Sequence, residues 1–379
     1  MIRILYFTRD YTTHDHRFLS AISGAGYQVF YMQLEQRGHI LEERGLPAGV
    51  VPVDWIGGQH EYQAAGQSRL VADLERVIHE VQPDLIQAGP LHLSAYLVAL
   101  TGFRALLSMS WGYDLLYEAQ RSAEHLQAIR YTLQHSAAML GDCDTIRKLA
   151  ISHGMADERI VTFPWGIDLQ HFTPRKDDRR EAQDRAYPHD VAPPFTLLST
   201  RGWEPIYGSD VLAQGFARAA CLCSELRLVM LGNGSQASVL RQIFEHTDVL
   251  GQVSFPGQVG YDDLPQYYRD ADLYVSASHS DGTSISLLEA LACGTPALVS
   301  DIPGNREWIT PGVEGWWFPD GDAEALSRMI LQAVELRRSM PEMGQAARHQ
   351  AERRADWKHN FPQLFQAYRI ALAVEEVTG

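Results

Sequence analysis

The stretch from Ser280 to Glu307, SDGTSISLLEALACGTPALVSDIPGNRE, is the part of the chain that most strongly decides the fold. It follows a strand-like apolar run, and its Asp-Gly-Thr-Ser group at 281–284 is typical of a turn. Residues 287–292 favour a helix, Gly294 stops that helix, and the proline two residues later prevents its continuation. The pattern therefore predicts a strand, a glycine-containing turn and the N-terminus of a helix.

The start of this helix has the chemistry of an anion site. Free backbone N–H groups meet a partial positive charge of about half a unit there, and Ser284 or Ser286 can cap the helix. Asp281 precedes the turn, and Glu289 lies roughly 7–8 Å past the helix start at a rise of ~1.5 Å per residue. Carboxylates accept hydrogen bonds from sugar hydroxyls, so the pattern fits a sugar–diphosphate–ribose ligand. The alternative is that Asp281 caps the turn and Glu289 is a solvated helix residue.

The same segment resembles the signature of glycosyltransferase family 4, the group 1 glycosyl transferases, which are retaining enzymes with the GT-B fold. In that signature seven residues separate an acidic residue from a Glu, as they separate Asp281 from Glu289, although the family more often has Glu first. Weaker matches are a glycine-rich turn at 232–234 and the segments 253–278 and 159–174, the last with Trp where Asn is usual. The phrase after the second acid matches at Ala290, Ala292, Cys293, Gly294 and Pro296.

The resemblance implies an α/β fold of the GT-B type, with two Rossmann-like, doubly wound parallel-sheet domains that face each other across a cleft. It also implies a metal-independent, retaining transfer from a nucleotide sugar on the C-terminal domain to an acceptor on the N-terminal domain. Arg201 and Asp281 would be the catalytic residues, since they match the family's phosphate clamp and sugar contact, and Glu289 would hold the ribose. The other donor-binding residues that it implies are Gly232, Gln258, Val259, Gly282, Thr283, Ser284, Ile285 and Tyr207.

Tyr207 departs from the family pattern, which usually has Lys followed by Gly six residues after the phosphate-clamping Arg. One of the two usual phosphate cations is therefore missing. Either Arg17 or Arg306 replaces it, or the donor binds weakly, or the donor carries fewer phosphate charges. The missing Lys also supports an alternative function, a non-catalytic GT-B scaffold that binds a saccharide or a partner protein. A further alternative is another GT-B enzyme, such as a nucleotide-sugar epimerase or a phosphorylase.

Two domains are predicted, because strand-like runs alternate with helical stretches over residues 1–170 and again over residues 195–355. We expect the first domain to bind the acceptor and the second to bind the nucleotide sugar. Residues 171–194 are charged, contain proline and have few aliphatic side chains, which predicts a linker. Residues 356–379 are helical in composition with a break at Pro362, and we expect this helix to pack back on the N-terminal domain.

Charged residues follow the first predicted strand, where the family often has a glycine-rich turn, and they should lie at the ligand edge of the sheet. We expect Asp15 and Arg17 to lie on the acceptor side; the alternative is that Asp15 caps the following helix. Trp111 and Asp114 belong to a Trp-Gly-x-Asp phrase that resembles a strand end of the family, and Trp111 can stack on a sugar face. The histidines beside Asp15 have no common zinc spacing, so no metal site is predicted.

Composition narrows the class of protein. A formal net charge of -15 over 379 residues disfavours bulk binding of nucleic acid. The four cysteines form no CxxC pair, which is typical of thiols in a reducing cytosol, and no stretch reads as a signal peptide or a transmembrane segment. We therefore expect a cytoplasmic protein, with contact to the inner face of the membrane as an option. Its expected partners are a nucleotide sugar and a saccharide or lipid-linked saccharide acceptor, without a cofactor.

Overall fold

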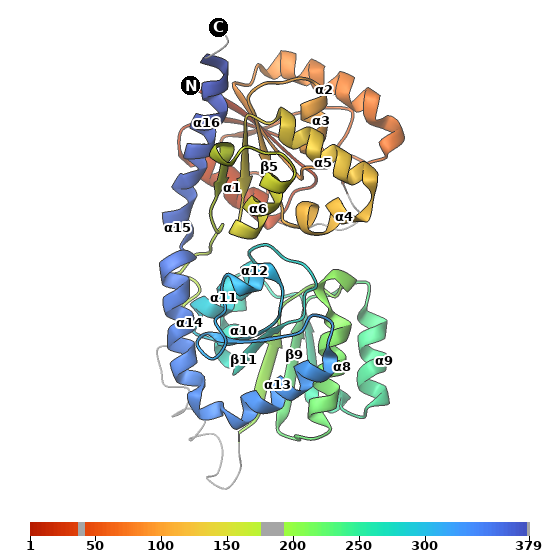
Figure 1. The fold of residues 1–379 in the computed structure, drawn as a ribbon, viewed down its shortest axis with the longest axis vertical. Helices are drawn as coiled ribbons and strands as arrows, with labels where there is room; N and C mark the ends of the chain where they lie inside the picture. The colour runs from red at the N-terminus through yellow and green to blue at the C-terminus, as the bar shows by residue number, and fades with distance from the viewer. Residues whose placement is uncertain (37–41, 176–192, 377–379) are drawn as a thin grey trace. The chain divides into compact units, whose positions relative to one another are not determined.

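The computed structural model describes residues 1–36, 42–175 and 193–376. The chain divides into two compact units. Unit 1 comprises Met1–Phe163 and Phe361–Gly379, and unit 2 comprises Pro164–Asn360. Each unit contains one parallel sheet with helices packed against it, which is the layered α/β arrangement that the alternating pattern predicts (Figure 1).

Unit 1 is built on a seven-stranded sheet. Its strands are β1 (Arg3–Thr8), β2 (Gln28–Gln33), β3 (Val50–Pro52), β4 (Leu85–Gly89), β5 (Leu106–Met109), β6 (Ala138–Gly141) and β7 (Ile160–Thr162). All neighbouring strands are parallel, in the order β3-β2-β1-β4-β5-β6-β7. The direction of the strand order reverses between β1 and β4, and open α/β sheets bind ligands at the carboxyl ends of strands beside such a point. The main helices are α1 (Thr13–Gly24), α2 (Gln67–Val81), α3 (Ser94–Leu100), α4 (Ala119–Arg121), α5 (Ala123–His135), α6 (Asp144–Ser152) and α16 (Leu364–Glu376).

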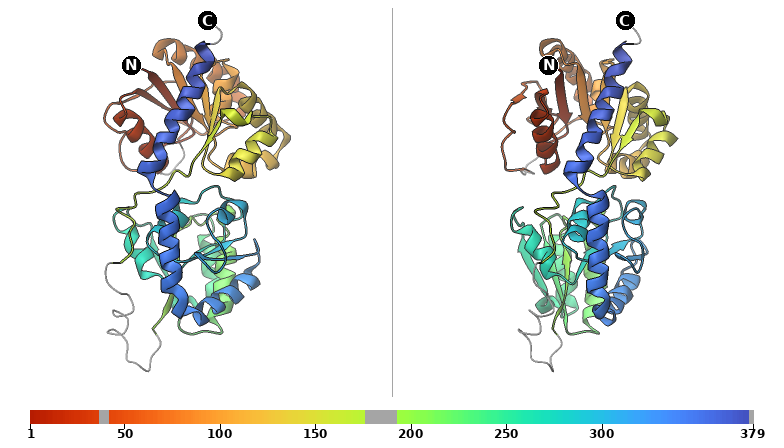
Figure 2. Two further views of the ribbon diagram at one scale, coloured as in Figure 1. Left: turned by 60° about the vertical axis from the view of Figure 1, so that its left-hand side comes forward. Right: turned by 90° about the vertical axis from the view of Figure 1, so that its left-hand side faces the viewer.

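The C-terminal helix α16 belongs to unit 1 although the chain reaches it only after unit 2 (Figure 2). The short helix α15 (Trp357–Asn360) is followed by a 3-10 turn that contains Pro362, and α16 starts after this turn. Tyr368 of α16 is buried, and its hydroxyl donates a 2.7 Å hydrogen bond to the side-chain oxygen of Gln87 on β4. Its ring also meets that of Tyr27 edge to face, so the helix is held by polar and aromatic contacts.

The junctions between the units lie before Pro164 and after Asn360, whereas the prediction put them after residues 170 and 355. The difference arises because the segment after β7 pairs with the segment before α15. The N–H of Ile167 donates to the carbonyl of Ala355 at 2.8 Å, and the N–H of Trp357 donates back to Ile167 at 3.0 Å. Most of the predicted linker, residues 176–192, lies outside the described residues.

Unit 2 is built on a six-stranded sheet. Its strands are β8 (Phe195–Ser199), β9 (Leu226–Leu231), β10 (Val253–Gly257), β11 (Leu273–Ser276), β12 (Ala297–Ser300) and β13 (Gly315–Phe318). They are parallel in the order β10-β9-β8-β11-β12-β13, so the strand order reverses between β8 and β11. The helices are α8 (Ser209–Ala220), α9 (Ala237–His246), α10 (Leu264–Asp270), α11 (Ile285–Ala292), α12 (Pro303–Arg306), α13 (Ala323–Glu335) and α14 (Met340–Arg354).

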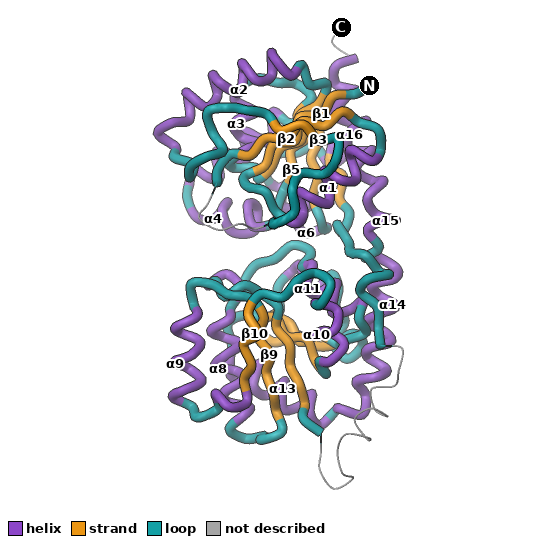
Figure 3. Tube along the Cα trace, turned by 180° about the vertical axis from the view of Figure 1, so that it is seen from behind, coloured by secondary structure: helices purple, strands orange, loops and turns teal. Residues whose placement is uncertain are grey.

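Two apolar cores lie on opposite faces of the unit 2 sheet, because successive strand residues point to opposite sides. Leu197 packs into the core formed with α8, α9 and α13, and Leu198 packs into the core formed with α10, α11 and α14. Figure 3 shows α8 and α9 beside β9 and β10. The buried strands fix where the loops after β8 and β11 begin, and these two loops carry the predicted site.

Candidate functional site

The N-terminus of α11 is open at the carboxyl edge of the sheet, next to the point where the strand order reverses. Ser284 occupies the N-cap position with an extended backbone, but its side chain makes no capping hydrogen bond. Its hydroxyl accepts a hydrogen bond from Arg201 instead, at 3.1 Å. The loop before the helix is fixed by α12, since a Cβ added to Gly304 would lie 2.2 Å from the carbonyl oxygen of Gly282. The first-turn N–H groups of α11 therefore have no side-chain cap and can receive an anion.

Arg201 lies at this helix start and is held on three sides. Its Nη2 is 2.8 Å from a carboxylate oxygen of Asp281, and its Nη1 donates to Ser284 and Ser286 at 3.1 and 3.2 Å. The ring of Tyr207 lies 4.2 Å from the guanidinium carbon, within the range of a cation–π contact. Burial opposes the charged form, but the Asp281 carboxylate holds the pKa of Arg201 above its usual value. A permanent positive charge thus sits where the prediction places the donor phosphates.

Glu289 is in the second turn of α11, and its side chain is buried, with a residue exposure of 8%. The alternative that it is a solvated helix residue is therefore wrong. One carboxylate oxygen accepts a 2.8 Å hydrogen bond from the hydroxyl of Tyr268 on α10, and this hydroxyl also lies 2.9 Å from that of Thr200. Burial and the nearby Glu289 charge raise the pKa of Tyr268 well above its usual value, so the phenol stays protonated and orients the carboxylate.

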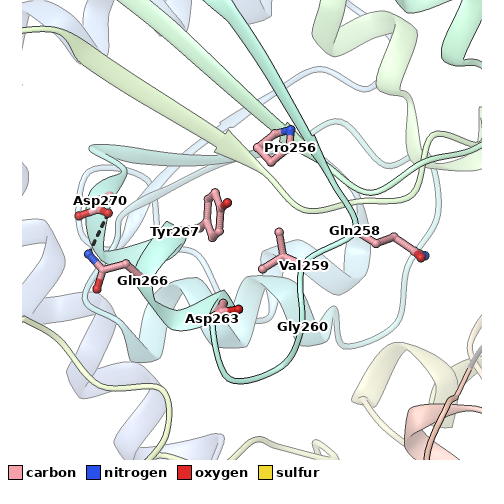
Figure 4. A pocket seen from close by; sticks show the side chains of 8 residues that line it. All are labelled: Pro256, Gln258, Val259, Gly260, Asp263, Gln266, Tyr267 and Asp270. Atoms are coloured by element: carbon pink, nitrogen blue, oxygen red, sulfur yellow. Dashed lines mark hydrogen bonds between the residues drawn. The ribbon is translucent and has the colours of Figure 1, made fainter.

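Three further predicted donor-side residues, Gly232, Gln258 and Val259, follow strands β9 and β10 at the same edge of the unit 2 sheet. Gly232 has a φ of +91°, and a Cβ there would lie 3.5 Å from the carbonyl oxygen of Arg201, so the turn after β9 approaches the loop after β8 closely. Gln258 and Val259 line a cleft of about 640 Å³ between the end of β10 and α10. In Figure 4 the side chains of Val259 and Tyr267 border this cleft from opposite sides, while Gln258 points away from Tyr267.

Asp15 and Asp114 in unit 1 are buried carboxylates that serve the local backbone. Thr12 donates to Asp15 through its N–H at 2.8 Å and its hydroxyl at 2.5 Å, and the phenol of Tyr6 donates at 3.1 Å. The N-cap of α1 is therefore Thr12, so the alternative that Asp15 itself is the cap is wrong: Asp15 is the N3 partner in a capping box. Burial raises the pKa of Asp15 to about 7, although the Thr12 hydrogen bonds favour the ionised form.

Asp114 accepts hydrogen bonds from the N–H groups of Leu91 and Leu115, both at 2.9 Å, and from the hydroxyl of Ser110 at 2.5 Å. It lies at the start of a π-helical turn (Asp114–Glu118) and joins the loops after β4 and β5. Both carboxylates are fully buried, so the expectation that Asp15 and Asp114 face an acceptor is not met by their geometry. The sequence places them at strand ends but does not show that the backbone N–H groups of neighbouring loops surround them.

Trp111 and Arg17 remain the half-exposed members of the predicted acceptor side. The ring of Trp111 lies 5.7 Å from that of His14 in the first turn of α1. Burial, together with the positive charge of Arg17, lowers the pKa of His14 to about 3, so this histidine is neutral. Trp111, His14 and Arg17 thus bring an aromatic ring, a neutral imidazole and a cation to the carboxyl edge of the unit 1 sheet.

Several residues of the two edges were missed by sequence reasoning. Tyr268, Tyr274 and Thr200 support the unit 2 site, since Tyr274 donates to Ser286 at 2.8 Å and Tyr268 bonds Glu289. In unit 1, Arg9 after β1 pairs with Glu35 after β2 at 2.5 Å. The Arg9–Glu35 pair could have been predicted from the sequence, because residues that directly follow two adjacent parallel strands lie close together.

Within the part of the chain that the structure describes, no group of three or more His, Cys, Asp and Glu residues is arranged to hold a metal ion. No helix among the described residues is both long and apolar enough to cross a membrane. Arg306 and Arg17, the two cations predicted as possible replacements for the missing Lys, lie in different units of the protein. Arg306 on α12 pairs with Asp301 at 2.6 Å and lies over the ring of Trp317, and Arg17 belongs to unit 1.

The comparisons with known proteins cover the part of the chain that carries this site. The sequence profile described as "Glycosyl transferases group 1" matches residues 182–350, which run from before β8 into α14 and include Arg201, Asp281 and Glu289. Over residues 182–350 the chain is similar to the group 1 glycosyl transferases.

Two curated relatives show how far along the chain the likeness extends. The chain is 26% identical over 292 residues to a GDP-mannose-dependent monoacylated α-(1-6)-phosphatidylinositol monomannoside mannosyltransferase of Corynebacterium glutamicum, covering 72% of this chain and 71% of the relative. It is 30% identical over 237 residues to a D-inositol 3-phosphate glycosyltransferase of Geodermatophilus obscurus, covering 60% of this chain. The aligned part spans 51% of that second relative, about half its length.

Solved structures show the fold of the chain. HepE from Anabaena in complex with UDP matches with a TM-score of 0.76 at 18% identity, over 96% of this chain and 99% of that one. A sucrose-phosphate synthase from Thermosynechococcus elongatus matches with a TM-score of 0.78 at 17% identity, over 98% and 100% of the two chains. The fold is GT-B, with one Rossmann-like parallel sheet in each unit, as the sequence predicts.

Proposed function

We propose that the protein transfers a sugar from a nucleoside diphosphate sugar bound by unit 2, with retention of anomeric configuration and without a divalent metal. The observation that carries the proposal is the set of groups around the N-terminus of α11. A largely buried cation, Arg201, lies at an uncapped helix start, with the Asp281 carboxylate before the helix and the Glu289 carboxylate in its second turn. This arrangement suits a ligand with phosphates in the middle and hydroxyl groups on either side.

The roles of these residues follow from their chemistry. The donor phosphates would bind the N–H groups at Gly282–Ile285 and the guanidinium of Arg201, and the ribose hydroxyls would donate to Glu289. Tyr268 already fixes the Glu289 carboxylate, so little side-chain freedom is lost when the ribose binds. The base would then lie toward the loop at Gln258 and Val259, and the transferred sugar toward Asp281.

The chemical step places new negative charge on the departing diphosphate. Arg201 and the dipole of α11 stabilise that charge more strongly than the charge of the intact donor, which lowers the barrier. We propose a front-face displacement through an oxocarbenium-like state, in which the acceptor hydroxyl attacks on the side that the diphosphate leaves. The acceptor would be a glycan, a lipid-linked saccharide or a small molecule, with Trp111 offering a ring face to a sugar.

A transfer assay in the presence of EDTA tests this proposal. A thermal-shift screen first selects the donor, because a ligand at 100 times its dissociation constant adds ~2.7 kcal/mol of stability. UDP-glucose and GDP-mannose are suitable first probes, since one was solved with HepE and the other is the donor named for the relative from C. glutamicum. We expect turnover to survive chelation and the product to keep the donor's anomeric configuration. Loss of turnover that manganese restores would refute the metal-free mechanism, and an inverted product would refute retention.

A further inference from the structure

The two residues assigned to the donor's phosphate and to its sugar bind each other in unit 2. Nη2 of Arg201 is 2.8 Å from a carboxylate oxygen of Asp281, and the two side chains are only 14% and 20% exposed. Nη1 of Arg201 donates to the neutral hydroxyls of Ser284 and Ser286, the ring of Tyr207 covers one face of the guanidinium, and Nε has no hydrogen-bond partner among the described residues. Asp281 is therefore the charged partner of Arg201 at the helix start.

A phosphate that approaches Arg201 competes with Asp281, because both groups are anions and both use the guanidinium through oxygen acceptors. It does not compete with Ser284 and Ser286, which take the other terminal nitrogen, or with Tyr207, which covers a face of the guanidinium. The neutral contacts can thus keep Arg201 in position while its carboxylate partner leaves. The ring at Tyr207 is a positioning group in a place where the family usually has a second cation.

We propose that the donor's diphosphate opens the Arg201–Asp281 ion pair and so releases Asp281 to the hydroxyls of the transferred sugar. This inference rests on the proposed function, and it adds that one carboxylate discriminates between the substrate and the product nucleotide. When a nucleotide sugar is bound, the released Asp281 accepts hydrogen bonds from the sugar. When only the nucleoside diphosphate is bound, Asp281 has lost its cation and faces the negative charge of the phosphates without a hydroxyl partner.

The proposal predicts that the variant Asp281→Asn changes the affinity for the free nucleotide and the preference for the nucleotide sugar in opposite directions. Asp281→Asn keeps the shape of the side chain but removes the competing charge and weakens the contact to the sugar. Free nucleoside diphosphate should therefore bind Asp281→Asn more tightly than it binds the wild type. The preference for the sugar-bearing nucleotide over the free nucleotide should fall. A side chain that only supports the fold would change both affinities in the same direction.

The test is isothermal titration of the full chain with two probe pairs, UDP and UDP-glucose, and GDP and GDP-mannose. For the pair that binds the wild type, we expect Asp281→Asn to bind the free nucleotide roughly 3–10-fold more tightly, the range for removing one competing ion pair of this kind. The preference for the sugar-bearing nucleotide should fall about 10-fold or more. The matched control is Asp320→Asn, which removes an ion-paired carboxylate of the same unit, 2.7 Å from His279, without touching Arg201.

Unchanged or weaker binding of the free nucleotide by Asp281→Asn would overturn the proposal, and so would an equal gain in Asp320→Asn, which would indicate a general charge effect. Asp281→Ser, which also removes the charge, serves as the second variant if the amide variant does not fold, and the same gain is expected. A wild type that binds neither probe pair would refute the proposed donor instead. If the wild type binds a probe pair but the variants do not bind the free nucleotide more tightly, only the ion-pair proposal is refuted.

Discussion

Removal of the Glu289 carboxylate should weaken nucleotide binding far more than it weakens the fold. A carboxylate that accepts two ribose hydroxyls makes two charge-assisted hydrogen bonds, each worth ~1.5–3 kcal/mol before competition with water is subtracted. For Glu289→Ala we therefore expect a loss of about 2–3 kcal/mol in binding, or roughly 30–150-fold in Kd. The stability cost should be about 1 kcal/mol, because Tyr268 loses Glu289 but keeps Thr200 at 2.9 Å.

The assay is titration with UDP and GDP and with their 2′-deoxy analogues, beside urea unfolding of each variant. The wild type should lose affinity when the 2′-hydroxyl is missing, whereas Glu289→Ala should bind both forms equally, since it has no acceptor to lose. Tyr268→Phe is the matched control, because it removes the phenol that contacts the carboxylate and leaves the carboxylate itself in place. Equal discrimination between the ribose and deoxyribose forms by wild type and Glu289→Ala would assign Glu289 to the fold alone.

Two other predictions follow from the contacts of single side chains. Arg201→Ala should reduce turnover at least ~100-fold while the protein stays folded, because the Arg201 charge stabilises the departing phosphate and one such donor is worth about 3 kcal/mol in the transition state. Steady-state kinetics at saturating donor measures this loss. An unchanged kcat in the folded variant would argue against the role. Asp15→Asn should flatten the pH dependence of stability. The pKa of Asp15 is raised to about 7, so its contribution is fully present below the unfolded value of ~3.9 and is lost as pH rises toward 7, by up to about 4 kcal/mol. Urea unfolding from pH 5 to pH 8 measures the slope, and identical slopes for the two proteins would contradict the assignment.

Local patterns were enough to predict the elements that carry the unit 2 site. The helix start at α11 and the spacing from Asp281 to Glu289 are contained in one short segment, so neither depends on long-range packing. Tyr268 and Tyr274 could not be assigned in the same way, because what brings them to α11 is the packing of α10 and β11 against that helix. The contact between Arg201 and Asp281 joins residues 80 positions apart, and only the strand order makes them neighbours.

Two strands were missed for physical reasons. β3 is only three residues long, ends in Pro52 and lies at the edge of its sheet, so it has neither length nor alternation to recognise. β13 begins at Gly315 with a φ of +154°, where a Cβ would lie 1.8 Å from the carbonyl oxygen of Ala297. A glycine before two tryptophans reads as a turn, whereas here its missing side chain allows two strands to approach. The orientation of side chains could not be predicted either, because a position after a strand does not show whether the side chain of Asp15 or Asp114 points outward.

The return of α16 to unit 1 makes the two units unequal during synthesis. Unit 2 is one uninterrupted stretch of chain, from Pro164 to Asn360, and it can be cut out by a single pair of cleavages. Unit 1 consists of two separate stretches of chain, and its helix α16 is translated only after the whole of unit 2. The first 163 residues therefore cannot complete their unit before that helix is made. Until then Gln87 lacks the phenol of Tyr368. When the ribosome has finished unit 2, it has therefore still to make the helix that completes unit 1.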